Sequence, residues 1–472
     1  MRQQLRPYQA RALADLRTRI AASQKRLILV APTGSGKTTI AAAVIEGAVA
    51  RGNRVLFLAH RKELVDQCVH RLEEHGITPG VIMAGRAPSP RREVQVASVQ
   101  TLARREVPPV ELVIVDEAHH ARAQSYQRAV AAAPFVLGLT ATPWRTDGRG
   151  LGELFQALVV AALPQQLISE GYLCPVTGFA YDAPDLSGVA TTGGDWEEQG
   201  AARAMSYVGG NIVQRWLDFR PGRTVLFACT IEHSRRMVEL FRGARVRAEH
   251  LDGTTPPGER GAILGRLAEG TTELVCNVGV LTEGWDLPAL RCVVLARPTQ
   301  STGLYLQMAG RCLRPASGKD VARIHDHAGN ALRHGPVDLD REYTLDSGKR
   351  RASDPVPRTM TCAKCYAIFS PGPKACPACG AELAQQRAPR EINEVDGVEV
   401  SLDEIRRRYV PAGEALPVWR QLQAQGEAAG YKPGWAKIRF QQRFGFWPRK
   451  EWCTPASTEI DAVLSAARVV AR

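Results

Sequence analysis

The segment APTGSGKTT at residues 31–39 places the tightest limit on what this chain can fold into. It follows the apolar run RLILV and leads into KTTIAAAVIEGAV, which has a helical pattern. A glycine-rich loop between a strand and a helix directs backbone amides at phosphate oxygens; here Lys37 would reach the β/γ oxygens and Thr38 would ligate Mg²⁺. The alternative is an ordinary glycine-rich turn, against which the flanking strand and helix argue. The candidate nucleotide-binding residues of the loop are Thr33, Gly34, Ser35, Gly36, Lys37, Thr38 and Thr39.

Two carboxylates, Asp116 and Glu117, end the apolar run in VIVDEAHH. Carboxylates in that position need a cation or a reaction to explain them. Asp116 would hold Mg²⁺ through water, and Glu117 would orient and deprotonate an attacking water. Taken alone, the pair could be the acidic start of a helix, near the positive end of its dipole. Together with the loop it predicts ATP hydrolysis, with ATP and Mg²⁺ as cofactors.

Four cysteines form two close pairs with the spacing C-x2-C-x10-C-x2-C, at Cys362, Cys365, Cys376 and Cys379. Two such pairs this close together predict tetrahedral thiolate ligation of Zn²⁺ with no open position, and therefore a structural zinc ribbon. A redox dithiol pair and an iron–sulfur cluster are the alternatives. The other seven cysteines are scattered singly, which argues against a disulfide framework.

Short continuous apolar runs alternate with helical patterns twice along the chain, from Lys25 to about Pro143 and again after Pro221. Such runs indicate parallel sheets covered by helices on both faces. At 472 residues the chain is also too long for one ordinary core. We therefore predict an α/β fold with two tandem parallel-sheet lobes, a zinc ribbon and a small, mostly helical C-terminal region. The expected boundaries are 1–165 for the first lobe, 166–220 for the interlobe connection, 221–345 for the second lobe, 355–385 for the ribbon and 386–472 for the tail.

The net charge of +13 and a pI near 9.4 predict attraction to polyanions such as nucleic acid, although a solvated basic face would give the same charge. No apolar run is long enough to span a membrane, and the N-terminus lacks the apolar core of a signal peptide. We therefore expect a cytoplasmic protein with no membrane partner.

The C-terminal tail interleaves aromatic with basic residues between Tyr431 and Trp452. Aromatic rings beside basic side chains can hold single strands by base stacking. The alternative is that the rings form the core of a small helical domain. The residues concerned are Trp435, Lys437, Arg439, Phe440, Arg443, Phe444, Phe446, Trp447, Arg449 and Lys450.

The segment IHDHAGN places His325 and His327 on one face of a strand, on either side of Asp326. A metal site is one interpretation, and hydrogen-bonded structure after the last strand of a lobe is the other.

Further motifs resemble those of superfamily 2 helicases over about residues 5–335. LRPYQ resembles the adenine-reading Q motif, FLAHRKELVDQ motif Ia, VASVQTL motif Ib, LTATPWR motif III, LFACT motif IV, VGVLTEGWDLP motif V and QMAGRCLRP motif VI. The resemblance implies two RecA-like lobes that hydrolyse ATP in the cleft between them. The implied nucleotide contacts outside the glycine-rich loop are Arg6, Gln9, Gly284 and Asp286. The implied residues that couple the ATP site to the strand-binding surface are His119, Thr140 and Thr142.

Motif VI places Gln307, Arg311 and Arg314 about one helical turn apart, so we expect all three on one face of a helix that points into the cleft. The two guanidinium groups would neutralise charge that develops on the γ-phosphate when the lobes close. An ordinary basic helix face is the alternative. Met308 stands where many relatives carry arginine.

The ribbon directly behind motif VI, the DHAGN…HG stretch and the GYKPGWA…FG-WP tail resemble the bacterial and phage RadD-type DNA repair helicases. This resemblance implies a DNA-stimulated ATPase that moves on or remodels DNA in repair or recombination. Its expected partners are single-stranded or branched DNA, with single-strand-binding or recombination proteins as further candidates. The alternatives are an RNA helicase, a restriction-system motor, and an ATP-switched zinc protein that binds DNA or recruits partners without separating strands.

Overall fold

The computed structural model describes residues 4–121, 123–144, 150–181, 183–206, 208–346, 359–383, 412–431, 434–444 and 448. The chain divides into a large unit, Met1–Gln385, and a small one, Gln386–Arg472, which are described separately. No helix within these described stretches is both long and apolar enough to cross a membrane.

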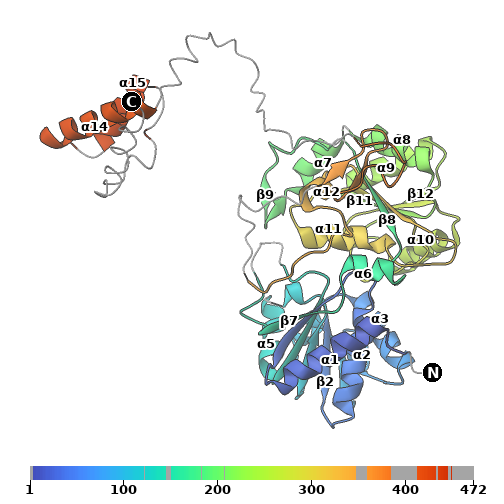
Figure 1. The fold of residues 1–472 in the computed structure, drawn as a ribbon. Helices are drawn as coiled ribbons and strands as arrows, with labels where there is room; N and C mark the ends of the chain where they lie inside the picture. The colour runs from blue at the N-terminus through green and yellow to red at the C-terminus, as the bar shows by residue number, and fades with distance from the viewer. Residues whose placement is uncertain are drawn as a thin grey trace. The chain divides into compact units, whose positions relative to one another are not determined.

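The first lobe is built on a seven-stranded parallel sheet in the order β3-β4-β2-β5-β6-β1-β7 (Figure 1). Its central strands are buried along their length because helices cover the sheet, so they carry apolar residues at successive positions. The elements are α1 (Pro7–Ala21), β1 (Arg26–Val30), α2 (Lys37–Val49), β2 (Val55–Ala59), α3 (Lys62–Glu74), β3 (Gly80–Ile82), β4 (Val94–Ser98), α4 (Val99–Leu102), β5 (Leu112–Val115), η1 (Ala118–His120), α5 (Gln124–Ala132), β6 (Phe135–Thr140) and β7 (Ala157–Val160).

The second lobe is built on an eight-stranded sheet in the order β12-β13-β11-β14-β15-β8-β17-β16. Its strands are parallel as far as β8, and the last two are antiparallel. Its elements, with those of the connection, are α6 (Pro164–Ser169), β8 (Val176–Ala180), β9 (Thr191–Thr192), β10 (Asp195–Trp196), α7 (Glu198–Ser206), α8 (Gly209–Phe219), β11 (Thr224–Ala228), α9 (Ile231–Gly243), β12 (Ala248–Leu251), α10 (Pro257–Glu269), β13 (Leu274–Asn277), β14 (Cys292–Ala296), α11 (Thr302–Ala309), η2 (Gly310–Cys312), β15 (Ala322–Asp326), α12 (Asn330–His334), β16 (Met360–Thr361) and β17 (Ala367–Phe369).

The predicted parallel α/β architecture is confirmed, and two features of the second sheet add to it. Strand β8 lies within residues 166–220, the expected interlobe connection, yet pairs with β15. Strand β17, from the cysteine-rich segment, pairs with the other edge of β8. The cysteine-rich segment therefore continues the sheet of the second lobe.

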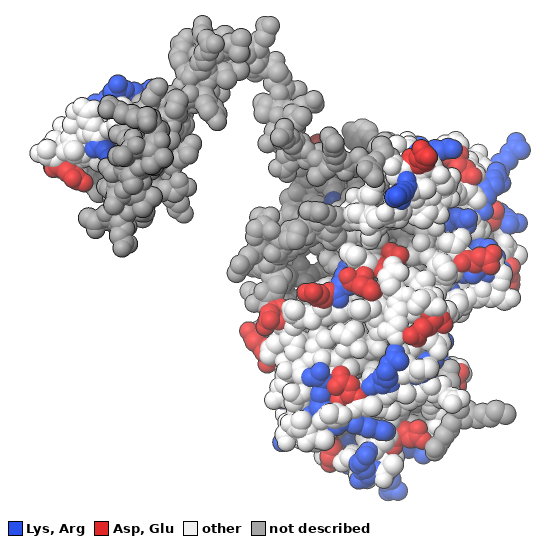
Figure 2. Space-filling view, viewed as in Figure 1, with Lys and Arg blue, Asp and Glu red and all other residues white. Residues whose placement is uncertain are grey.

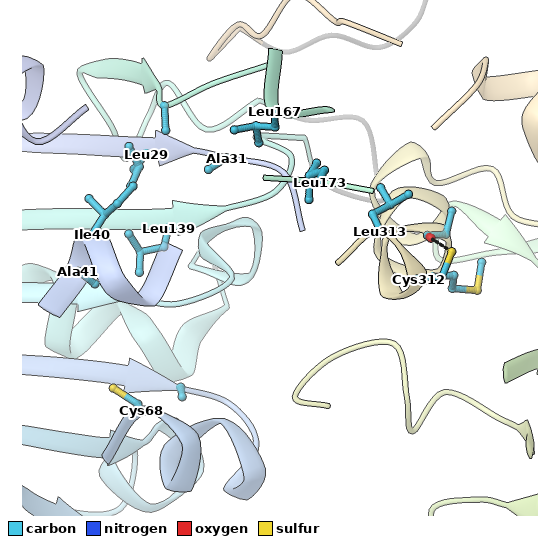
Figure 3. Packing of buried hydrophobic residues seen from close by; sticks show 14 of the residues in the cluster. Leu29, Ala31, Ile40, Ala41, Cys68, Leu139, Leu167, Leu173, Cys312 and Leu313 are labelled. Carbon is cyan, nitrogen blue, oxygen red and sulfur yellow. Dashed lines mark hydrogen bonds between the residues drawn. The ribbon is translucent and has the colours of Figure 1, made fainter. Parts of the chain in front are cut away.

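Apolar packing continues from the first lobe into the second (Figure 3). Leu29, Ile40 and Leu139 lie in the first lobe, and the same cluster includes Leu173 of the connection and Leu313 of the second lobe. The connection is held there by its backbone, because the Cys174 N–H donates to the Leu313 carbonyl at 2.7 Å. The entrance to the second lobe is thus fixed next to the segment that follows α11.

The small unit contains two described helices, α14 (Ala412–Ala428) and α15 (Gly434–Phe444). Trp419 and Phe440 are both fully buried and meet edge to face, with ring centroids 5.7 Å apart. For Phe440 the structure therefore favours the core interpretation over base stacking. Trp435 is half-buried, and Lys437, Arg439 and Arg443 are exposed. Phe446, Trp447, Arg449, Lys450 and the side chain of Phe444 lie outside the described residues.

Candidate active site

A cavity of about 380 Å³ lies between the two lobes and is lined by residues from both. A separate, largely apolar cavity of about 450 Å³ beside α1 and α2 includes none of the predicted site residues. Predicted site residues that line the interlobe cavity are Arg6, Gln9, Thr33, Gly34, Gly36, Lys37, Thr38, Thr39, Asp116, Glu117, Gly284, Asp286, Arg311 and Arg314. Those that do not line it are the four paired cysteines and Ser35, His119, Thr140, Thr142 and Gln307.

The glycine-rich loop connects β1 to α2, as the sequence predicts. Gly34 and Gly36 have positive φ angles of 86° and 82°, a conformation that favours glycine. The ammonium of Lys37 donates to the Ala31 carbonyl at 3.3 Å. Burial lowers the pKa of Lys37, while Glu117 and Asp116 oppose that shift. The loop therefore presents a partly buried cation at the start of a helix, where phosphate oxygens bind favourably.

Helix α1 holds this loop from the outside. The side-chain amide of Gln9 donates to the Ser35 carbonyl at 3.1 Å, and the Tyr8 hydroxyl donates to the same oxygen. This explains why Ser35 is buried behind the cavity. The Arg6 guanidinium lies 4.7 Å from the ring centroid of Tyr172, so the two form one wall of the cavity.

The acidic pair lies directly after β5 and faces the loop. Glu117 has φ 49°, an uncommon backbone conformation for a residue with a side chain, and its N–H donates to Asp116 Oδ1 at 3.1 Å. Burial, and then the neighbouring Glu117, raise the pKa of Asp116 to about 7, with Lys37 opposing. Within the described part of the chain Glu117 Oε2 is buried and has no hydrogen-bond partner. Two such carboxylates with one nearby ammonium fit a divalent cation.

A chain of polar contacts leads from Glu117 towards the second lobe. His119 Nδ1 lies 3.4 Å from Glu117 Oε2 and 3.3 Å from Thr140 Oγ1, and the Thr140 hydroxyl donates to the Thr142 carbonyl at 2.6 Å. Burial lowers the pKa of His119. A Cβ placed on Gly303 of α11 would lie only 2.9 Å from Thr142 Oγ1. The three predicted coupling residues are therefore in contact with one another, and the last of them touches the second lobe.

The arginines of motif VI reach the cavity from the second lobe. Arg311 Nη1 donates to the Trp285 carbonyl at 2.6 Å, and its Nε donates to the Gln307 carbonyl at 3.3 Å. Burial lowers the pKa of Arg311, and Glu117 and Glu283 oppose that shift. Arg311 is therefore anchored by backbone oxygens and faces the carboxylates of the first lobe.

Arg314 forms an ion pair with Asp286, and burial, with Arg71, lowers its pKa to about 10. The prediction that it shares a helix face with Gln307 is wrong. Helix α11 ends at Ala309 and a 3-10 turn ends at Cys312, so Arg314 lies beyond both. Pro315 follows Arg314 and disfavours a helical conformation for it, which accounts for the difference.

Sequence reasoning missed Tyr172 and Trp285, both of which line the cavity. Tyr172 lies 5.3 Å from Tyr8, measured between ring centroids, and offers an aromatic surface beside Gln9. It stands in the connection, where no local pattern marks it. Trp285 could have been found, because it lies between two predicted contacts, Gly284 and Asp286.

The four paired cysteines come together outside this cavity, and their sulfur atoms all lie within 4.8 Å of one another. The Cys362–Cys379 and Cys365–Cys376 sulfur atoms are 3.8 and 3.6 Å apart. Four thiolates about 2.3 Å from one zinc ion would be about 3.8 Å apart, so the geometry fits zinc. Both pairs share one backbone pattern, because the Cys362 and Cys376 N–H groups each donate to the carbonyl five residues later.

His325, Asp326 and His327 lie on and just after β15 and are buried. The Tyr181 hydroxyl lies 3.1 Å from His325 Nδ1, and Asp326 accepts from the N–H groups of Ala328 and Ala331 at 3.0 and 2.6 Å. Neither metal-compatible cluster in the described chain includes them. For His325 and Asp326 the structure therefore supports hydrogen-bonded structure and not a metal site, whereas neither ring nitrogen of His327 has a hydrogen-bond partner among the described residues.

Two family descriptions match the chain and together cover just over half of it. Residues 2–145 match "Type III restriction enzyme, res subunit", and residues 211–316 match "Helicase conserved C-terminal domain". The first match contains the glycine-rich loop and the acidic pair, and the second contains motifs IV to VI.

Several known proteins are similar to the chain. A 51.5 kDa protein of Lactococcus phage (isolate 7-9) is 27% identical over 92% of this chain and 95% of its own length. The putative ATP-dependent helicase IRC3 of Saccharomyces cerevisiae is 32% identical over 69% of this chain, which spans only 51% of that relative. DNA 3′-5′ translocase XPB2 of Sulfurisphaera tokodaii is 30% identical over 35% of this chain and 37% of its own length.

The fold resembles a fragment of a putative HsdR subunit of a type I restriction enzyme from Vibrio vulnificus YJ016. The TM-score is 0.56 at 23% identity, over 71% of this chain and 66% of the other. The two family matches, and the cavity that both lobes line, show that the chain belongs to the superfamily 2 helicases of the DEAD/DEAH type. It is an ATP-hydrolysing enzyme of that class.

Proposed function

We propose that the protein is a DNA-stimulated ATPase that translocates on or remodels DNA in repair or recombination, like the RadD-type helicases that its ribbon and tail resemble. The observation that carries the proposal is the cavity in which the phosphate loop, the acidic pair and the motif VI arginines meet. Residues from both lobes form one site, so nucleotide chemistry there is linked to the relative position of the lobes.

In this proposal the first lobe binds the nucleotide. Lys37 compensates the charge on the β and γ phosphates, and Thr38 and Asp116 hold Mg²⁺, which supplies charge neutralisation at the phosphates when bound. Glu117 accepts a proton from the attacking water. Its buried Oε2 and its uncommon backbone conformation suit that role, because this oxygen accepts no hydrogen bond from the described chain and has only His119 Nδ1 nearby, at 3.4 Å.

The second lobe supplies Arg311 and Arg314. Arg311 approaches Glu117 from across the cavity and would stabilise charge on the transferred phosphoryl group. Asp286 partly neutralises the charge of Arg314. The full charge of Arg314 can therefore act on a phosphate only if this ion pair breaks. The contacts from Glu117 through His119, Thr140 and Thr142 would report the state of the γ-phosphate to the second lobe.

The four cysteines would hold one Zn²⁺, and the zinc would organise a segment that lacks a core of its own. That segment packs Cys362, Cys376 and Ala367 against Phe179 and Tyr181, next to β8 of the second lobe. The proposed domain boundaries are those expected from the sequence, except that β8 of the connection belongs to the sheet of the second lobe and the ribbon extends that sheet through β17.

DNA is proposed as the partner because one relative carries the printed name DNA translocase, and because motif III reads LTATP and motif II reads DEAH. The net positive charge agrees with a polyanion. On the face shown in Figure 2, Lys and Arg side chains are interspersed with Asp and Glu over both lobes. That face therefore shows no broad patch of a single sign.

The test compares steady-state ATPase rates with single-stranded DNA, duplex DNA, RNA and no nucleic acid. Stimulation by DNA well above that by RNA supports the proposal, and preferential stimulation by RNA overturns it. Strand separation and displacement of a bound protein block are then measured separately. Lys37→Ala is the control in each assay, because every ATP-driven activity must be lost with it.

A further inference from the structure

A cluster of three histidines and one glutamate lies where the two lobes meet, behind motif II and outside the ATP cavity. His60 follows β2, His119 and His120 lie in η1, and Glu283 enters from the motif V loop of the second lobe. Glu283 Oε2 is 2.6 Å from His60 Nε2, and its Oε1 is 3.8 Å from His120 Nε2 and 4.0 Å from His119 Nε2. Two chain segments of one lobe and one of the other therefore converge on a single carboxylate.

Three of these groups have the arrangement of metal ligands. One ring nitrogen each from His60 and His120 and a carboxylate oxygen of Glu283 all lie within 4.8 Å of one another. Ligand atoms about 2.0–2.2 Å from one ion in tetrahedral geometry would be roughly 3.3–3.6 Å apart, so small ring rotations suffice. Two imidazoles and a carboxylate suit zinc-like divalent ions, whereas Mg²⁺ and Ca²⁺ prefer oxygen ligands throughout.

One oxygen of the buried Glu283 carboxylate also lacks a hydrogen-bond donor. The residue is only 7% exposed, and no hydrogen bond of acceptable geometry from the described residues reaches its Oε2. The close approach of His60 does not meet the angular requirement, and a buried charged oxygen without a donor is costly. His120 is 44% exposed at its side chain, which leaves an ion a route from solvent and a position for water.

Arg61 is the competing cation. Its Nε lies 3.7 Å from Glu283 Oε2, beyond hydrogen-bond distance, while its Nη1 donates to the carbonyls of Gly279 and Val280 at 3.3 and 3.2 Å. Because the guanidinium is engaged with the backbone, it lowers the affinity for an ion through charge repulsion but leaves the ligand atom unoccupied.

We propose that His60, His120 and Glu283 form a binding site for a zinc-like divalent transition ion that links the two lobes. Only the closed arrangement of the lobes brings all three ligands together, because two come from the first lobe and one from the second. An ion that binds the closed arrangement more tightly stabilises it by that difference in affinity. Lobe opening then becomes slower, and ATP turnover falls. The inhibition rests on the proposed function, whereas ion binding does not.

The test uses the full chain with its ribbon saturated with zinc, and Co²⁺ as the probe. Calorimetry and visible absorption are recorded during titration with Co²⁺ in the presence of Mg²⁺. We expect one further ion per chain, with a spectrum that lacks the intense near-ultraviolet band of cobalt thiolates, because the ligands are nitrogen and oxygen. A thiolate band would assign the uptake to the ribbon and overturn the site.

The variants His120→Ala and Glu283→Gln are each expected to weaken Co²⁺ binding by about tenfold or more, since each removes one of three ligands. The His120 side chain is half exposed, and glutamine has nearly the same shape as the glutamate it replaces, so both variants should fold. The matched control is His70→Ala, which removes an exposed histidine 3.4 Å from Glu74 on α3. Equal affinity in all three variants, or no uptake beyond the ribbon, overturns the proposal.

The second readout is the ATPase rate with Co²⁺ divided by the rate of the same variant without it. Co²⁺ at a saturating concentration should lower this ratio for the parent and His70→Ala proteins and leave it near one for His120→Ala. Uptake of Co²⁺ without inhibition overturns the linkage between the lobes. Absence of any ATPase activity before Co²⁺ is added is a failure of the proposed function, and the binding data still decide the site.

Discussion

Replacing Gly310 by alanine tests whether the approach of the lobes seen here is the one that hydrolysis requires. Gly310 follows α11 directly in a right-handed helical conformation, with φ −66° and ψ −12°, so its own backbone tolerates a side chain. A Cβ at this position would lie 2.8 Å from the Cβ of Thr33, in the phosphate loop of the opposite lobe. The substitution therefore obstructs the interface between the lobes without straining the helix.

The expected magnitudes follow from those distances. Carbon atoms in contact are separated by about 3.5–4.0 Å, so the lobes must part locally by roughly 1 Å. A displacement of that size at reacting groups costs about 10²-fold in rate, or about 2.7 kcal/mol. In a helical conformation alanine is preferred over glycine by about 0.5–1 kcal/mol, so the stability of the second lobe should stay the same or rise. Turnover and stability are thus expected to change in opposite directions.

The assay pairs the kcat of ATP hydrolysis with thermal unfolding of the same preparation. Gly261→Ala is the matched control, since it makes the same change in α10 of the same lobe, with nothing within 4 Å of the added Cβ. It should keep the parent kcat. Parent-like turnover in Gly310→Ala would refute the view that this close approach belongs to the catalytic state. A fall in both kcat and melting temperature would assign the effect to folding.

The remaining predictions concern the ATP site and the ribbon. Lys37→Ala and Glu117→Gln should abolish ATP hydrolysis while DNA binding, measured by fluorescence anisotropy, largely survives; turnover in a clean Glu117→Gln preparation would contradict the assignment of the base. Arg311→Ala and Arg314→Ala should lower kcat far more than they raise KM for ATP, and equal losses in both would count against a role in the transition state. One zinc per chain should be found by elemental analysis, and Cys376→Ser should lose it with basal ATPase mostly retained and DNA stimulation reduced. Iron with visible absorbance, or no metal, would overturn the zinc assignment.

Strand positions were predictable wherever helices cover both faces of a sheet. The runs RLILV, VLFLA, VQVAS and TVLFA became strands because burial on both faces favours apolar residues at successive positions, with only single polar exceptions such as Gln95. Strand β8, with the sequence VTGFA, was not predictable by that rule. It lies near the sheet edge, and Gly178 accommodates Ile368 of β17, with the Ile368 Cγ2 3.1 Å from where a Cβ would stand. Its partner comes from a segment nearly 200 residues away in the sequence, which no local pattern reports.

The candidate site, like the fold, was predictable where local sequence motifs form it and not where distant segments meet. The phosphate loop and the acidic pair are local motifs, so their chemistry could be stated from the sequence, including Lys37 and Glu117. Contacts between the lobes could not be predicted, because they join residues far apart along the chain. The pairing of Arg314 with Asp286 and the approach of Glu283 to His60 both depend on how closely the lobes meet. Sequence identifies the groups that react, and the packing of the two lobes decides which of their charges are already compensated.

The neutralisation of some of these charges by neighbouring ion pairs affects which ligand the cavity favours. Five cationic side chains line it, at Arg6, Lys37, Arg71, Arg311 and Arg314, against three anionic ones at Asp116, Glu117 and Asp286. Arg71 is held by Glu74 at 2.9 Å, and Asp286 offsets Arg314, so Lys37 and Arg311 supply the positive charge that faces the acidic pair. They come from different lobes and are both partly buried, and like charges that approach each other repel unless negative charge lies between them. A polyphosphate in the cavity would satisfy both at once. After cleavage, release of the γ-phosphate would remove part of the negative charge between them, and the lobes would be free to separate.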